Sequence, residues 1–137
     1  MDSTVGKILI VEDNSAVREL MAVVLRRSGY EVFEAGDGLQ GTEQAGSLYP
    51  DLIIVDLGLP GFGGDQLIAC IKADYRTAAI PAIVNTACPP NNPAVKRAIA
   101  AGAAEILFKP TELKLLLAAV SRHVLRPPNC TQNSRAA

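Results

Sequence analysis

Five short segments rich in β-branched and aliphatic residues recur along the chain, and each is followed by a segment with helical periodicity. The five segments are residues 7–11, 31–35, 52–55, 82–84 and 105–108. The first, third and fourth are almost continuously apolar, which is typical of parallel strands with both faces covered. The second and fifth carry charged residues and suit the edges of a sheet. This alternation predicts an α/β domain with a parallel sheet.

The intervening segments place apolar residues three to four positions apart, as amphipathic helices do. The clearest repeats are Val17, Leu20, Met21, Val24 and Leu25 in the first helix and Leu113, Leu116, Leu117, Val120 and Val124 in the last. Asn14 or Ser15 can cap the first helix, Gly29 can end it, and Thr111 can cap the last. A shorter repeat predicts a helix over 93–102, and the rhythm of the chain predicts weaker helices over 38–47 and 64–73.

Right-handed crossovers leave few ways to connect five parallel strands. One of them is the strand order 2-1-3-4-5, a doubly wound, flavodoxin-like sheet with helices on both faces, and we predict this fold. In such sheets ligands bind beyond the carboxyl ends of the strands, next to the point where the strand order reverses. Residues that follow the strands are therefore the first candidates for a functional site.

The composition argues against several other classes of protein. The 137 residues correspond to about one domain, which we place at 1–126, with 127–137 as a disordered tail or the start of a linker. A formal charge of −1 argues against direct binding of nucleic acid. Apolar runs of about six residues are too short to span a membrane. The first residues do not resemble a secretory signal, so we expect a cytoplasmic protein without membrane attachment.

Cysteine and histidine are too few and too scattered for most site chemistries. Cys70, Cys88 and Cys130 form no C-x-x-C pair, so neither a disulfide framework nor a cysteine zinc site is expected. His123 is the single histidine and lies within the last helical repeat. We expect it to be structural or solvated rather than catalytic.

Polar residues follow four of the five predicted strands. Glu12 and Asp13 follow the first strand, Asp56 the third, Thr86 the fourth and Lys109 the fifth. With the order 2-1-3-4-5 these strands are consecutive neighbours about 4.8 Å apart, so the five side chains can share one pocket. Each residue type alone is common after a strand, but their coincidence at four strand ends is specific.

Three carboxylates in one pocket repel one another unless a cation is present. Lys109 supplies one positive charge, and Mg²⁺, which prefers oxygen ligands, would supply two more. An aspartate can act as a nucleophile toward phosphorus. Mg²⁺, Lys109 and the Thr86 hydroxyl could then each neutralise one phosphoryl oxygen. These residues predict a magnesium site suited to phosphoryl transfer onto an aspartate.

The segments that carry these residues resemble the receiver domain of two-component response regulators, in a chemotaxis-regulator-like form. The resemblance spans most of the chain and is carried by residues 8–14, 56–64, 86–87, 101–103 and 109–110. It implies that Asp56 accepts a phosphoryl group from a histidine kinase or a histidine phosphotransfer protein. It also implies Mg²⁺ as cofactor, with Asp13, Asp56 and the carbonyl of Gly58 as ligands and Glu12 acting through water. Thr86 and Lys109 would contact the phosphoryl group.

Further expectations follow from the resemblance. The chain would be a phosphoacceptor signalling domain that catalyses its own phosphorylation and dephosphorylation, rather than an enzyme with other substrates. The Lys109-Pro110 bond would be cis. A kinase would dock near the first helix, at Arg18 and the loop 56–61. An unknown downstream protein would bind the surface formed by the helix at 93–102, the strand at 105–108 and the last helix. Its basic side chains would be Lys96, Arg97, Lys114 and Arg122.

Two features depart from the family pattern. The family often has a rotating Tyr or Phe three residues before the lysine, whereas this chain has Ile106. The usual coupling between Thr86 and an aromatic side chain is therefore not expected. Gly58 and Cys88, two residues beyond Asp56 and Thr86, offer no strong base to orient water. We therefore predict slow to moderate loss of the phosphoryl group.

Other interpretations compete with this one. Gly36, Gly38 and Gly41 match G-x-G-x-x-G, but the motif follows a strand expected at the sheet edge, so we interpret Gly36 and Gly38 as turn and helix-start residues. The glycines at 61–64 lack the Lys-Ser/Thr of a phosphate-binding loop. A hydrolase using an aspartyl-phosphate would need an acid where Gly58 stands. The alternative that stays open is a pseudo-receiver, never phosphorylated, that acts as a protein-interaction module.

Overall fold

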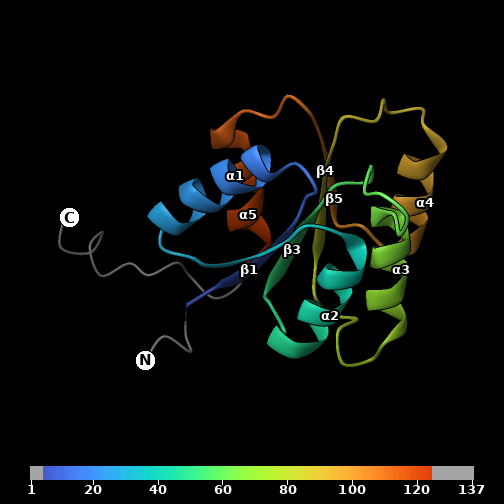
Figure 1. Ribbon diagram of the computed structural model, residues 1–137, viewed down its shortest axis with the longest axis horizontal. Helices are drawn as coiled ribbons and strands as arrows, with labels where there is room; N and C mark the ends of the chain where they lie inside the picture. The colour runs from blue at the N-terminus through green and yellow to red at the C-terminus, as the bar shows by residue number, and fades with distance from the viewer. Residues whose placement is uncertain (1–4, 125–137) are drawn as a thin grey trace.

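The computed structural model describes residues 5–124, so the tail predicted at 127–137 lies outside the described residues. Strands and helices alternate along this part of the chain (Figure 1). The strands are β1 (Lys7–Val11), β2 (Glu31–Ala35), β3 (Leu52–Val55), β4 (Ala82–Thr86) and β5 (Glu105–Phe108). The helices are α1 (Ser15–Arg27), α2 (Gly38–Leu48), α3 (Gly64–Ala73), α4 (Pro93–Ala101) and α5 (Leu113–His123). The predicted alternation is confirmed.

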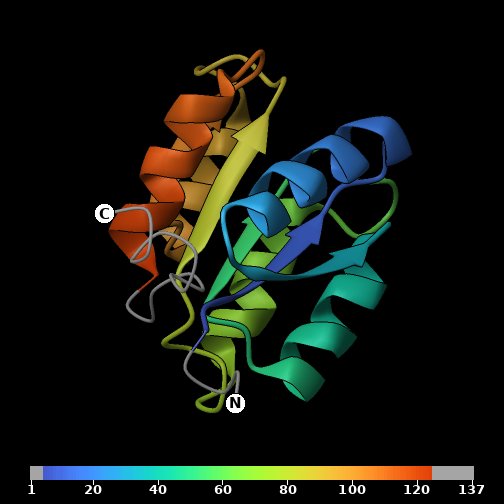
Figure 2. The ribbon, with the colours of Figure 1, turned by 90° about the vertical axis from the view of Figure 1, so that its left-hand side faces the viewer.

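The strands form one parallel sheet in the order β2-β1-β3-β4-β5. Figure 2 shows them side by side, with helices on both sides of the sheet. The central strands β1, β3 and β4 are buried throughout except for Lys7 at the start of β1. The more charged strands β2 and β5 lie at the edges. The predicted order and the doubly wound architecture are therefore confirmed.

Different helices cover the two faces of the sheet (Figure 1). α1 and α5 pack on one face, and α2, α3 and α4 pack on the other. The strand residues under α1 and α5 include Ile8, Ile10, Leu52, Ile54 and Ile83, and those on the other face include Leu9, Val11, Ile53, Val55 and Val84. Because successive strand side chains point to opposite faces, a central strand must be apolar at every position.

The helices are short, and the longest described one, α1, has 13 residues. Each buries one apolar stripe against the sheet. Asn14 caps α1 as predicted, since its Oδ1 accepts a hydrogen bond of 3.0 Å from the backbone N–H of Val17. Among residues 5–124, no helix combines the length and the apolar character needed to cross a membrane.

One local expectation was wrong at the carboxyl end of the sheet. β4 continues past its apolar run at 82–84 to the polar residues expected at its end, because Asn85 and Thr86 pair with β5 residues Leu107 and Phe108. The N-cap of α5 is Glu112 rather than Thr111. The Thr111 hydroxyl instead donates to Oδ1 of Asn85 at 2.6 Å. Residues next to the helix start do not indicate this acceptor, because it lies on another strand.

Candidate functional site

The polar residues predicted at the strand ends lie together at the carboxyl end of the sheet. Backbone hydrogen bonds extend the sheet one residue past three strands, which anchors these residues on neighbouring strands. The bonds run from Glu12 N to Ala35 O (3.0 Å), from Asp56 N to Val11 O (3.1 Å) and from Lys109 N to Thr86 O (2.7 Å). The Lys109-Pro110 bond is cis, as expected.

Lys109 joins acids that belong to two different strands. Its Nζ lies 2.9 Å from Oε1 of Glu12 and 3.1 Å from Oδ2 of Asp56. The Glu12 side chain is 2% exposed and that of Asp56 is 11% exposed. Taking two carboxylates out of water is costly unless cations compensate them. One lysine compensates one of the two charges, so the pocket keeps an excess of negative charge.

The charges of the pocket shift the ionisation of its members. Burial raises the pKa of the Glu12 carboxyl above its usual value, although hydrogen bonds from Lys109 and from the Asn14 N–H oppose this rise. The charge of Asp56 raises that pKa further. Burial by itself would lower the pKa of the Lys109 ammonium, but its hydrogen bonds to Glu12 and Asp56 outweigh burial and raise it. Lys109 is therefore firmly charged.

Carboxylate oxygens of Glu12, Asp13 and Asp56 all lie within 4.8 Å of one another. Glu12 and Asp56 are buried, whereas Asp13 is exposed, so the cluster opens to solvent at Asp13. Gly58 is close by, since its backbone N–H donates to Oδ1 of Asp56 at 3.1 Å. Mg²⁺ prefers hard oxygen ligands and is usually held by one or two carboxylates and several waters, so this cluster supplies enough donors. The donor set fits the predicted ion.

Thr86 and Ile106 lie on the strands that complete the pocket. Thr86 is fully buried, and its Oγ1 accepts a 3.1 Å hydrogen bond from the backbone N–H of Cys88. A hydroxyl that accepts one bond can still donate its own proton. Ile106 is half-buried and packs against the apolar cluster under α2, α3 and α4. An aliphatic side chain therefore fills the position where the family often has an aromatic one.

Two hydrogen bonds around the pocket were not predicted. Thr111 bonds to Asn85, which is 5% exposed, and so ties the end of β4 to the loop that follows Lys109. The sequence hint for this bond was Asn85 itself, because a polar side chain at the end of a buried strand needs a hydrogen-bond partner. The second bond runs from Nη1 of Arg18 to the backbone oxygen of Glu12, at 2.7 Å. No local pattern indicates it, because it depends on how α1 packs beside β1.

The glycines of the G-x-G-x-x-G match have packing roles. A Cβ atom on Gly38 would lie 2.4 Å from the backbone oxygen of Phe62. One on Gly41 would lie 2.8 Å from side-chain atoms of Val11 and Leu67. α2 can approach the sheet and the loop before α3 only because these positions carry no side chain. Close packing accounts for both glycines without a bound dinucleotide.

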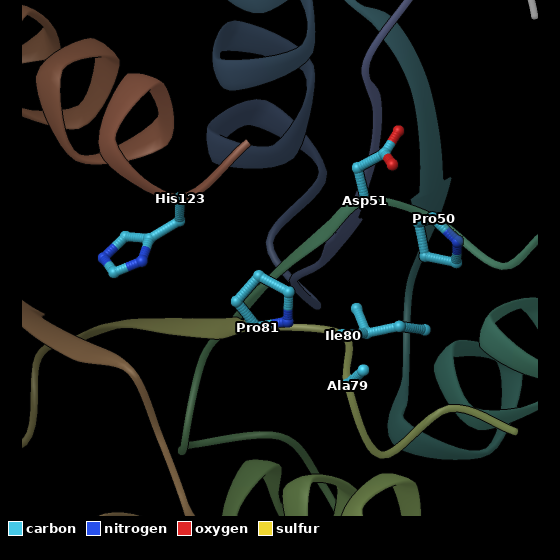
Figure 3. Close-up of a pocket in the computed structure, with 6 residues that line it drawn as sticks. All are labelled: Pro50, Asp51, Ala79, Ile80, Pro81 and His123. Atoms are coloured by element: carbon cyan, nitrogen blue, oxygen red, sulfur yellow. The ribbon is translucent and has the colours of Figure 1, made fainter. Parts of the chain in front are cut away.

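A small hollow of about 230 Å³ lies at the opposite, amino end of the sheet (Figure 3). Its lining residues are Pro50, Asp51, Ala79, Ile80, Pro81 and His123. Figure 3 shows the His123 ring turned away from Asp51. Nε2 of His123 lies 2.9 Å from Oε1 of Glu105, so the ring ties α5 to β5. This contact is what the expected structural role of His123 requires.

The four basic residues predicted on the surface of α4, β5 and α5 are all exposed. Two of them are engaged in ion pairs: Arg97 with Asp65 of α3, at 2.7 Å, and Arg122 with Glu105 of β5. The surface is therefore less basic than the sequence suggests. Lys96 and Lys114 are the other exposed basic side chains that the sequence analysis placed on this surface.

Comparison with known proteins shows the family of the chain. The model of the response regulator receiver domain matches residues 8–121. The transcriptional regulator RpaA of Synechocystis is 34% identical over 131 residues, which cover 93% of this chain and 54% of RpaA. The phosphate regulon regulator PhoB of Escherichia coli is 35% identical over 114 residues, covering 83% of this chain and 49% of PhoB. The chain thus spans about half the length of these relatives.

Solved structures agree with these relatives. The receiver domain of a sensor histidine kinase from Pseudomonas aeruginosa, solved with a magnesium ion in its active site cleft, superposes with a TM-score of 0.81 at 28% identity. The match covers 88% of this chain and 98% of that domain. Sequence, fold and pocket agree that the chain belongs to the response regulator receiver domains of two-component signal transduction.

Proposed function

We propose that this domain is a phosphorylation-dependent signalling switch in which Asp56 accepts a phosphoryl group in the presence of Mg²⁺. The observation that carries the proposal is the charge imbalance of the pocket, where Lys109 pairs with Glu12 and Asp56 and a third carboxylate, Asp13, lies beside them. A divalent cation would correct this imbalance. Family membership supplies the class of reaction.

In the proposed reaction, a carboxylate oxygen of Asp56 attacks the phosphorus of a phosphohistidine. The new P–O bond forms as the P–N bond breaks, and the electron pair returns to the imidazole nitrogen. With acetyl phosphate as donor, the P–O bond to the acetyl group breaks and acetate leaves. Asp13, Asp56 and the Gly58 carbonyl would hold Mg²⁺, with Glu12 acting through water, and the ion would offset charge on the phosphoryl oxygens.

Lys109 and Thr86 would bind the phosphoryl oxygens. The Lys109 ammonium has three N–H donors, so it can keep its bond to Glu12 while a second N–H turns from Asp56 to the phosphoryl group. The Thr86 hydroxyl can donate its proton while it still accepts from the Cys88 N–H. The Lys109 ammonium is held beside Asp56 before the reaction, and such advance positioning of a donor is the condition for electrostatic stabilisation of a transferring group.

A histidine kinase or a histidine phosphotransfer protein is the proposed donor, and the proposed target is a protein that binds the surface of α4, β5 and α5. Movement of Thr86 toward the phosphoryl group would carry the following loop and α4 with it. Because Ile106 cannot rotate as an aromatic ring does, α4 would carry most of the response. RpaA and PhoB are transcriptional regulators, but we propose that this domain acts by protein contact, without direct contact to nucleic acid.

The test is phosphorylation by acetyl phosphate with Mg²⁺, followed by intact-mass spectrometry. The chain should gain the mass of one phosphoryl group, and EDTA should prevent the gain. Asp56→Asn should abolish it, whereas the matched control Asp74→Asn, at the end of α3, should retain it. A gain that survives Asp56→Asn would contradict the assignment. No gain in the unmutated chain would favour the pseudo-receiver.

The lifetime of the phosphorylated form tests the chemistry of the neighbouring positions. Gly58 and Cys88 supply no carboxylate or amide that could orient a water molecule toward the phosphorus. We therefore expect slow to moderate intrinsic dephosphorylation, measured as the decay of the added mass after removal of the donor. Loss within seconds, in the absence of a phosphatase, would contradict this expectation.

A further inference from the structure

We propose that Arg18 of α1 is a positioning residue of the acidic pocket. Its guanidinium holds the main chain at Glu12 and thereby sets the Glu12–Asp13 half of the metal site. The prediction is that the affinity for Mg²⁺ depends on Arg18 and on Glu34, the β2 residue that orients it. The inference rests on the proposed function only in taking Mg²⁺ as the ligand of the pocket.

The Glu12 carbonyl lies at the point where the sheet ends. The N–H of Glu12 still donates to Ala35 O, the last residue of β2, at 3.0 Å. Nη1 of Arg18 donates to the Glu12 oxygen at 2.7 Å, beyond the last bond that β2 provides. A guanidinium therefore takes the place of the next strand partner. A hydrogen bond from a charged donor is also stronger than the backbone bond it replaces.

Glu34 holds this guanidinium from the neighbouring strand. Nε of Arg18 lies 3.3 Å from Oε1 of Glu34, and the Arg18 side chain is only 21% exposed. The other carboxylate oxygen, Oε2, lies 3.3 Å from Nη1 of Arg26, also on α1. Arg26 uses its Nη2 to bond Val32 O at 2.8 Å. Glu34 thus pairs with two arginines, of which Arg18 bonds to Glu12 and Arg26 bonds to β2.

The Arg18 bond acts on one half of the metal site. The Glu12 carbonyl and the Asp13 N–H belong to one planar peptide unit, so the orientation of this carbonyl fixes the position of the Asp13 backbone and thus of its side chain. The Glu12 side chain has its own contacts, to Lys109 and to the Asn14 N–H. Asp56 is held independently, by Lys109 and by the Gly58 N–H. Loss of Arg18 should therefore weaken metal binding and leave the nucleophile in place.

The experiment compares Arg18→Ala with Arg26→Ala. Both remove one arginine of α1 from Glu34, but only the first removes the bond to Glu12. The initial rate of phosphorylation by acetyl phosphate is measured against Mg²⁺ concentration, and Mg²⁺ binding is measured separately by calorimetry. Arg18→Ala should raise the half-saturating Mg²⁺ and the Kd about tenfold, as loss of a group that orients metal ligands does. The rate at saturating Mg²⁺ should stay within about twofold, because Asp56 is untouched.

Arg26→Ala should leave both Mg²⁺ values within about twofold of those of the unmutated chain. Arg18→Lys, which keeps a charged donor, should fall between Arg18→Ala and the unmutated chain, and Glu34→Gln should raise the Mg²⁺ requirement without removing Arg18. Equal effects of Arg18→Ala and Arg26→Ala would overturn the proposal. So would a fall in the saturated rate with an unchanged Mg²⁺ requirement.

Two further readouts keep the test decisive. If Arg18→Ala unfolds, Arg18→Lys and Glu34→Gln, checked by thermal melting, carry the same comparison with Arg26→Ala. If the unmutated chain is not phosphorylated, the proposed function fails, but calorimetry still measures how each variant binds Mg²⁺. Failure of the inference and failure of the proposed function therefore give different results.

Discussion

The two clusters of charge that contact β5 or its end are built in opposite ways. At the carboxyl end of the sheet, Glu12 and Asp56 are nearly buried and share Lys109, with the exposed Asp13 beside them. In the second cluster, at the start of β5, Glu105 is paired with Arg122 and His123 of α5. All three side chains are at least one-quarter exposed. The first cluster has three carboxylates for one cation, and the second has one carboxylate for two basic partners.

This difference distinguishes a ligand-binding site from ion pairs that only hold two elements together. Buried charges require near-complete compensation, and a cluster that lacks it costs stability until a ligand supplies the missing charge. Exposed ion pairs contribute about 0–1 kcal/mol whether or not a ligand binds. The pocket at the carboxyl end therefore gains most from a cation, whereas the pairs of Glu105 mainly fix α5 against β5.

Replacement of Lys109 should have the largest effect on this comparison. Lys109→Met keeps an unbranched side chain but leaves Glu12 and Asp56 without their cation. In EDTA, the free energy of unfolding should fall by about 3 kcal/mol. Arg122→Met, the matched change in the exposed cluster, should cost less than about 1 kcal/mol. Urea denaturation measures both, and equal losses would show that burial does not distinguish the clusters.

Addition of Mg²⁺ should stabilise the chain through the first cluster alone. At a hundred times its Kd, the ion should add about 2.7 kcal/mol to the free energy of unfolding, seen as a rise in Tm. Asp13→Asn should shrink this rise by weakening the site. Glu105→Gln should leave it unchanged, because Glu105 takes no part in the pocket. A full rise that persists in Asp13→Asn would place the ion elsewhere.

The pH dependence of the second cluster is the smallest effect expected. Burial by itself would raise the pKa of the Glu105 carboxyl, but hydrogen bonds from His123 and Arg122 outweigh it, and the pKa lies below its usual value of 4.5. A carboxyl with a lowered folded pKa stabilises the fold above its unfolded pKa and loses that contribution as pH falls through the folded pKa.

Glu105→Gln should therefore cost up to about 1 kcal/mol at neutral pH, and the cost should shrink as the pH falls below 4.5 and vanish once the pH lies below the folded pKa. Urea denaturation of the variant and the unmutated chain at several pH values measures the difference. A cost that persists unchanged at low pH would mean that packing, rather than charge, makes residue 105 important.

Much of the architecture could be predicted from local patterns. Ile8–Ile10 and Leu52–Val55 are apolar at every position, so they predict buried parallel strands, and handedness then restricts their order. Glu12 and Asp56 follow those strands directly, so the meeting of their side chains follows from the strand order. Because strand order alone brings the ends of β1 and β3 together, an acidic pocket could be predicted without knowledge of side-chain contacts.

The contacts that could not be predicted join different elements of the fold. Thr111 looked like a helix cap, but its hydroxyl bonds to Asn85, 26 residues earlier. β4 continues through Thr86 because β5 offers it partners. The sequence placed Arg18 near a docked kinase but did not indicate that its guanidinium bonds to the Glu12 carbonyl and to Glu34. Periodicity carries no information about such contacts.

The sequence by itself determined the fold class and the set of acids, hydroxyl and lysine at the strand ends. Hydrophobic periodicity shows where each strand and helix lies, and the handedness of the connections restricts the order of the strands. Only the tertiary structure decided how these groups share charge. It placed Lys109 between Glu12 and Asp56 and Arg18 on the Glu12 carbonyl. Hydrogen bonds and desolvation act over a few ångströms, so they are settled only when distant segments have packed.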